Sequence, residues 1–79
     1  SGALAELLRK AAEKAGSFVQ KAAADPSLLS GEARHAWVVQ EVLPLLSETA
    51  KDVLPAIREA VVNIAVKSVY EQLKSKGNL

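Results

Sequence analysis

The sequence predicts an all-α fold, a compact single-domain bundle of about five helices over residues 1–79. Apolar residues recur every three or four positions along most of the chain, which is the spacing of one helix face and not the alternation of a strand. Glycine and proline separate these segments. Because 49% of the residues are hydrophobic but only 4% are aromatic, we expect a core made mainly of Ala, Leu and Val side chains.

Two helices are predicted before the first proline. The first begins at a cap provided by Ser1 or Gly2 and ends at Gly16, because glycine tolerates the left-handed conformation at a helix end. Ser17 then caps a short second helix that ends near Ala24. The expected buried faces of the two helices are Leu4, Leu7, Leu8, Ala11, Ala12 and Ala15, followed by Phe18, Val19, Ala22 and Ala23.

The third predicted helix is the most apolar one and is expected at the centre of the bundle. It covers Gly31–Leu43, and Ser30 caps it. Residues 25–29, which contain an Asp-Pro pair, fit a single helical turn ahead of that cap. Pro44 disfavours helical dihedral angles at Leu43, so we predict a boundary or a sharp kink there.

A fourth helix is predicted over residues 45–54, and a fifth from near Pro55 to about Lys76, with Gly77 as its terminator. Pro55 either breaks the chain between them or lies in the first turn of the last helix, capped by Asp52. Short connections imply that successive helices pack as neighbours. The last helix carries two apolar stripes, which predict two packing partners: Ile57, Val61 and Ile64 on one side, and Val62, Val66, Val69 and Leu73 on the other.

Composition excludes several classes of protein. Ten basic and nine acidic residues give a formal charge of +1, which is not the electrostatic footprint of a nucleic-acid binder. The chain has no cysteine for a disulfide, a thiolate nucleophile or a zinc site. No apolar run approaches the roughly 20 residues of a membrane span. Ser1-Gly2 resembles a protease-cleavage scar, and Gly77–Leu79 resembles the stub of a tag.

His35 is the only histidine, and on the helical wheel it falls between Val39 and Val42, at an apolar flank. It has the chemistry of a general base or of a single axial haem ligand. The interpretation that we favour is a histidine at a helix margin that hydrogen-bonds a backbone carbonyl or water. A metal site needs three or four converging ligands, and no second His, no Cys and no ligand motif accompanies it. We therefore predict no catalytic, cofactor-binding or metal-binding residue.

Other candidate groups have simpler interpretations. Ser47 and Ser68 lie in no nucleophile motif, and Arg58 and Asn63 are expected at helix flanks. Trp37 either lines a ligand pocket or, as we favour, is the largest core anchor. The carboxylates that could act as acid–base pairs all fall on polar faces: Glu6, Glu13, Glu41, Glu48, Glu59 and Glu71. The lysines that could form a patch for anionic lipid or nucleic acid are interspersed with acidic residues: Lys10, Lys14, Lys21, Lys67, Lys74 and Lys76.

Across its whole length the chain resembles computationally designed helical proteins. It shares with them an Ala/Leu/Val core, the absence of Cys and Met, Ser or Asp at helix starts and Gly at helix ends. Pro44, Pro55, His35 and the valine-rich last helix look borrowed from natural proteins, as in a design assembled from native helical fragments. The resemblance implies a structural scaffold with no biochemical function: not an enzyme, without cofactor, nucleic acid or membrane partner, and a monomer or a homodimer.

The alternative is a small lipid- or helix-binding module similar to saposin-like domains. Those domains are also compact five-helix proteins of about this length, although this chain lacks their cysteines. The likeness rests on helix number and amphipathicity, and it implies binding to a lipid or to a partner helix.

Overall fold

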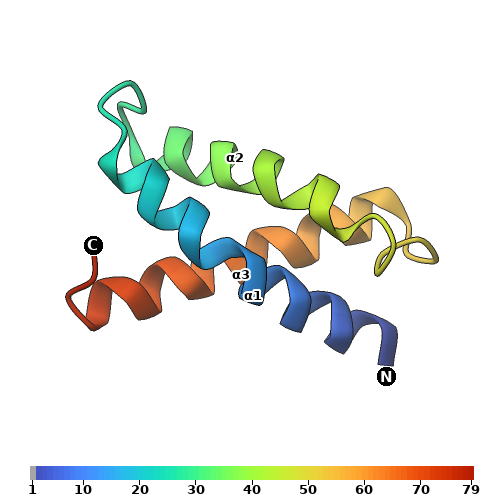
Figure 1. Ribbon diagram of the computed structural model, residues 1–79. Coiled ribbons are helices and arrows are strands. Elements are labelled where there is room, and N and C mark those ends of the chain that lie inside the picture. Colours follow the sequence, from blue (N-terminus) through green and yellow to red (C-terminus); the bar gives the residue numbers. More distant parts are fainter. Residues whose placement is uncertain (1) are drawn as a thin grey trace.

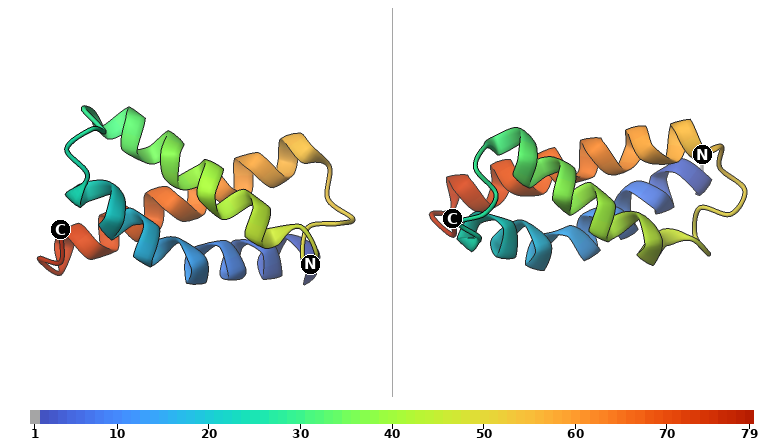
Figure 2. Two further views of the ribbon diagram at one scale, coloured as in Figure 1. Left: turned by 45° about the horizontal axis from the view of Figure 1, so that its top comes forward. Right: turned by 90° about the horizontal axis from the view of Figure 1, so that it is seen from above.

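The computed structural model describes residues 2–79, and this part of the chain forms three α-helices and one short 3-10 helix. The all-α class is confirmed, but the prediction of five helices is wrong. Helices α1 and α3 run in the same general direction and cross, while α2 runs the opposite way along them (Figures 1 and 2). In chain order the elements are α1 (Gly2–Ala24), α2 (Gly31–Val42), the 3-10 helix η1 (Leu43–Leu46) and α3 (Pro55–Ser75).

Helix α1 is one continuous helix where the sequence predicts two. Gly16 does not end it, and Ser17 does not begin a new helix. Glycine in a helix interior costs roughly 1 kcal/mol relative to alanine. An interruption would cost more here, because the buried face continues in register on both sides of the glycine, through Leu7, Ala11, Ala15, Val19 and Ala22.

Helix α2 begins as predicted, because Ser30 is its cap. The Ser30 hydroxyl accepts a hydrogen bond from the Ala33 N–H at 3.0 Å. Residues 25–29 do not form a helical turn; Asp25 instead accepts hydrogen bonds from both the N–H and the hydroxyl of Ser27.

The boundary expected at Pro44 is a change from α-helix to 3-10 helix that begins at Leu43. Leu43 keeps helical dihedral angles (φ −49°, ψ −49°), so the expectation that proline displaces them is wrong. The tighter 3-10 turn continues the chain direction without the hydrogen bond that proline cannot donate.

The helix predicted over residues 45–54 does not form. Residues 47–53 make consecutive turns, in which the Ala50 N–H donates to the Leu46 carbonyl and the Val53 N–H to the Ala50 carbonyl. Prolines restrict both ends of this segment, and Leu54 is extended (ψ 141°) because Pro55 follows it.

Helix α3 begins with Pro55 as its first residue, so the first-turn alternative is correct. The cap position is Leu54 without a side-chain cap, and the role predicted for Asp52 is wrong. The predicted terminator is confirmed: Gly77 has a positive φ of 74°, and the Asn78 N–H donates to the Leu73 carbonyl at 2.8 Å. This is a Schellman ending.

The two glycines Gly16 and Gly77 predict opposite effects of the same substitution. A Cβ added at either would meet no heavy atom within 4 Å, but only Gly77 has a positive φ. We expect Gly16→Ala to raise the free energy of unfolding by about 0.5–1 kcal/mol through helix propensity. Gly77→Ala should lower it by about 1–2 kcal/mol. Urea denaturation followed by circular dichroism measures both, and equal effects would contradict an uninterrupted α1.

The core contains only Ala, Leu and Val, as expected from composition. No polar or charged residue is buried in residues 2–79. Successive helices pack as neighbours, as predicted, but the most extensive contact is between α1 and α3, which are not successive. The buried residues are Leu7, Ala11, Ala15, Val19, Ala22, Val38, Val39, Val42, Leu46, Ala50, Val53, Val62, Ala65, Val66 and Val69.

The two predicted apolar stripes of α3 differ in burial. The stripe that contains Val62 and Val66 is buried, and α3 contacts both other helices. On the other stripe Val61 is partly buried, but Ile57 and Ile64 are 43% and 60% exposed. Helix α3 therefore has two packing partners, α1 and α2. The stripe of Ile57, Val61 and Ile64 is not the face that packs closely against either of them.

Candidate functional site

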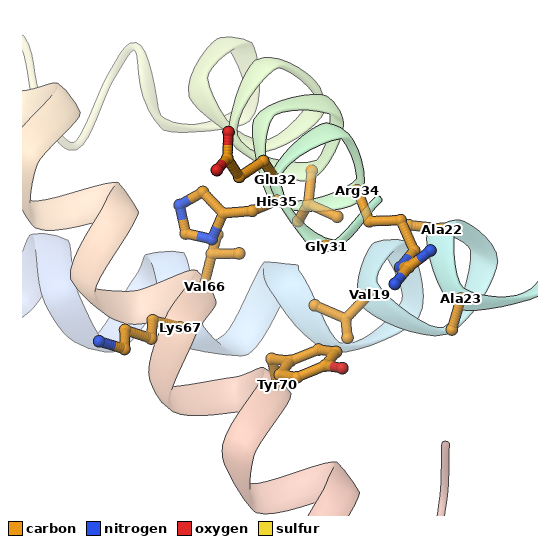
Figure 3. A pocket seen from close by; sticks show the side chains of 11 residues that line it. Val19, Ala22, Ala23, Gly31, Glu32, Arg34, His35, Val66, Lys67 and Tyr70 are labelled. Atoms are coloured by element: carbon orange, nitrogen blue, oxygen red, sulfur yellow. The ribbon is translucent and has the colours of Figure 1, made fainter. Parts of the chain in front are cut away.

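A cleft of about 400 Å³ lies where the C-terminal part of α1, the first half of α2 and the middle of α3 come together (Figure 3). It is open to solvent on one side, and its surface is mostly apolar. Residues from all three helices line it: Val19, Ala22, Ala23, Gly31, Glu32, Arg34, His35, Val38, Val66, Lys67 and Tyr70.

The cleft exists because small residues occupy the positions where α1 and α2 approach α3. Ala22, Ala23 and Gly31 have little or no side chain, so the space between the larger groups stays unfilled. Val38 and Val66 are almost fully buried and form its apolar interior. A cavity of this size lies within the range of about 300–1,000 Å³ that small-molecule sites occupy.

His35 is fixed beside the cleft by a contact between α2 and α3. Asn63 donates through Nδ2 to the Glu59 carbonyl at 2.9 Å, which leaves its Oδ1 facing the imidazole. His35 Nε2 therefore donates to that Oδ1 over 2.6 Å. In the neutral ring this arrangement makes Nδ1 the basic nitrogen. The partner is thus a side-chain amide of the neighbouring helix, where a backbone carbonyl or water was expected.

Asn63 is the hydrogen-bond partner of the His35 ring within residues 2–79. Within residues 2–79 no serine hydroxyl and no carboxylate lies within hydrogen-bonding distance of the ring. The same part of the chain holds no cluster of three or more His, Asp or Glu side chains that could bind a metal ion.

Trp37 lies on α2 but does not line the cleft. Its ring packs edge-on against Phe18 of α1, with 6.0 Å between the ring centroids and 69° between the planes. Lys21 Nζ lies 5.2 Å from the centre of the Phe18 ring. Both aromatic residues are partly buried and pack against the core. Trp37 therefore packs against the edge of the core, and the interpretation as its largest buried anchor is wrong.

The other candidates lie on exposed surfaces, and among them Ser68, Glu71 and Lys67 line a second, shallower hollow on α3. Ser47 and Ser68 are exposed, and so are all six glutamates that were considered as acid–base groups. Glu6 and Glu13 both pair with Arg9, and its hydrogen bonds lower the pKa of Glu6. Of the six lysines, only Lys67 lines the cleft.

Asp25 has a lowered pKa for a local reason, because the Ser27 side chain and backbone both donate to it. It therefore stabilises the connection between α1 and α2.

Arg34, Glu32 and Tyr70 belong to the cleft, although the sequence alone did not indicate them as site residues. Only the small residues Ala22 and Ala23 of α1 and Gly31 of α2 could have signalled an open space.

Comparison of this chain with family models, with curated proteins and with solved structures gives no match. No helix in residues 2–79 combines the length and the apolar character required to cross a bilayer.

Proposed function

We propose that this protein is a small helical binding module that receives a largely apolar ligand in the cleft between its three helices. The observation that carries the proposal is the cleft of about 400 Å³, with buried valines inside and polar groups among its exposed lining residues. Apolar walls with a few polar groups that orient the ligand are typical of small-molecule sites. The proposal is related to the alternative of a lipid- or helix-binding module that the sequence suggests.

The walls of the cleft are held in place before any ligand arrives. Val19, Val38 and Val66 belong to the continuous core, and the hydrogen bond between His35 and Asn63 ties α2 to α3 beside the cleft. A site that is formed in advance loses little conformational freedom on binding, which favours affinity. The apolar ligand would gain roughly 25 cal/mol for each Å² removed from water.

A second candidate is the structural scaffold without a ligand, which follows from the resemblance to designed proteins. The observation that favours it is the uniform Ala/Leu/Val core without a buried polar residue in the described chain. Such a core needs no ligand to complete it, and residues 2–79 hold no cluster of three or more His, Cys, Asp or Glu side chains that could bind a metal ion. The experiment below separates the two candidates.

The test is a titration with octanol, followed by the methyl signals of Val19, Val38 and Val66 in NMR spectra. We expect saturable shifts of these methyl groups in the native protein. Ala23→Phe should weaken binding by about tenfold or more, because Ala23 lines the cleft and a benzyl group would occupy it. Ala24→Phe is the matched control, since Ala24 is exposed on the same helix end and does not line the cleft.

Two results would contradict the proposal. One is the absence of saturable shifts in the native protein, which would favour the scaffold. The other is an equal loss of binding in Ala23→Phe and Ala24→Phe, which would place the binding outside the cleft. Circular dichroism of both variants checks that the helices are retained.

A further inference from the structure

The charged groups around the cleft are unevenly distributed. In the view of Figure 3, Glu32, His35 and Lys67 lie toward one end, and the Arg34 guanidinium lies toward the other. Glu32 and Lys67 carry opposite charges, so the lining has no net formal charge at their end. Arg34 is the only charged residue of the lining at the opposite end. The cleft is therefore electropositive at one end.

The Arg34 guanidinium is oriented by the protein but not neutralised by it. Its Nη1 donates to the Leu28 carbonyl at 3.1 Å, in a partly buried contact. Among residues 2–79 no carboxylate lies within ion-pair distance of it. A guanidinium has five N–H donors, so further donors remain for a ligand.

Tyr70 adds a second polar group at the same end. Its ring lies across the cleft, and in Figure 3 its hydroxyl points to the side on which Arg34 lies. The ring face can cover a hydrocarbon chain while the hydroxyl donates to a head group. An oriented guanidinium and a phenol are suited to a planar carboxylate.

We propose that the cleft selects a free medium-chain monocarboxylate, with its carboxylate at Arg34 and Tyr70 and its hydrocarbon chain along Val19, Val38 and Val66. This inference rests on the proposed function, because it requires a ligand in the cleft. A free amphiphile is favoured over a membrane surface because the apolar lining lies between helices and the net charge of the chain is only +1. The single guanidinium of the lining matches one carboxylate.

The experiment compares octanoate with octanol at neutral pH, where octanoate is ionised and the two hydrocarbon chains are alike. We expect the native protein to bind octanoate about tenfold more tightly than octanol, as for one charge-assisted hydrogen bond. In Arg34→Gln the ratio of the octanoate affinity to the octanol affinity should fall to about one. Circular dichroism of the variant checks that the helices are retained.

Lys14→Gln is the matched control for charge. It removes one positive charge at an exposed position of α1 that does not line the cleft, so the preference for octanoate should persist. If Arg34→Gln also retains the preference, the assignment of the carboxylate to Arg34 is wrong. Contacts in NMR spectra between the Tyr70 ring and the methylene next to the carboxylate are expected, and contacts to the terminal methyl instead would reverse the orientation.

The two proposals fail in different ways. Equal affinities of the native protein for octanoate and octanol would overturn the carboxylate site and support the apolar cleft. No binding of either compound would overturn the cleft as a binding site, and the carboxylate site with it.

Discussion

Leu46→Ala is expected to lower the free energy of unfolding by about 2–5 kcal/mol. Leu46 is only 1% exposed and connects the 3-10 helix η1 to the core, so its truncation would leave a cavity that the short helix cannot close. A loss of this size is a large part of the stability of a domain this small. Urea denaturation followed by far-UV circular dichroism measures it.

Leu45→Ala is the matched control for Leu46→Ala. The two leucines are neighbours in the same 3-10 helix, but Leu45 is 52% exposed. We expect Leu45→Ala to change stability by less than about 1 kcal/mol. Equal losses in the two variants would contradict the direction in which η1 inserts into the core.

Arg58→Ala is expected to lower the free energy of unfolding by about 1–3 kcal/mol, mainly by loosening residues 47–54. Its Nη2 donates to the carbonyls of Ala50 and Val53, both at 2.9 Å, in a segment without a regular helix. The Nε atom is buried and has no partner in the described chain, so the guanidinium is already imperfectly satisfied there. Arg58→Lys should lie between the native protein and Arg58→Ala.

The control for Arg58 is Arg9, which makes three side-chain hydrogen bonds to Glu6 and Glu13 on the exposed face of α1. Water replaces such bonds readily, so Arg9→Ala should leave the unfolding midpoint nearly unchanged. Hydrogen exchange of the Ala50 and Val53 amides provides an independent measurement. Protection that survives in Arg58→Ala would show that the turns do not depend on the guanidinium.

Short-range patterns in the sequence predicted those features that depend on neighbouring residues. The face of α1, the Ser30 cap and the Gly77 terminator each follow from spacing or from one residue's backbone preference. The prediction of a helix end at Gly16 was wrong because a glycine can end a helix but can also lie inside one, and the residue type alone does not distinguish the two positions. Only the buried residues on both sides of it decide that the helix continues.

The segment at 47–54 could not be predicted for a related reason. Its apolar spacing fits a helix, and Leu46, Ala50 and Val53 are indeed buried. A helix there would also have to be compatible with the backbone restrictions of Pro44 and Pro55 and with the direction in which α3 begins. Arg58 supplies the missing backbone hydrogen bonds from another helix, which no local pattern reveals.

The cleft depends on how the helices cross, and its residues are distant in the sequence. His35 was recognised as lying at an apolar flank, and its pairing with Asn63 required the placement of α3 beside α2. Arg34 and Tyr70 are ordinary surface residues in the sequence. They become candidates only when α1, with its alanines, leaves an open space beside them.

The extensive contact between α1 and α3 has a consequence for the way in which this chain folds. These helices lie at opposite ends of the sequence, so their pairing closes a long loop before much apolar surface is covered. Contacts between residues far apart in the sequence lower the folding rate relative to contacts within a hairpin of adjacent helices. The helical hairpin of α1 and α2 then gains most of its stability only when the C-terminal helix docks, which makes the transition cooperative.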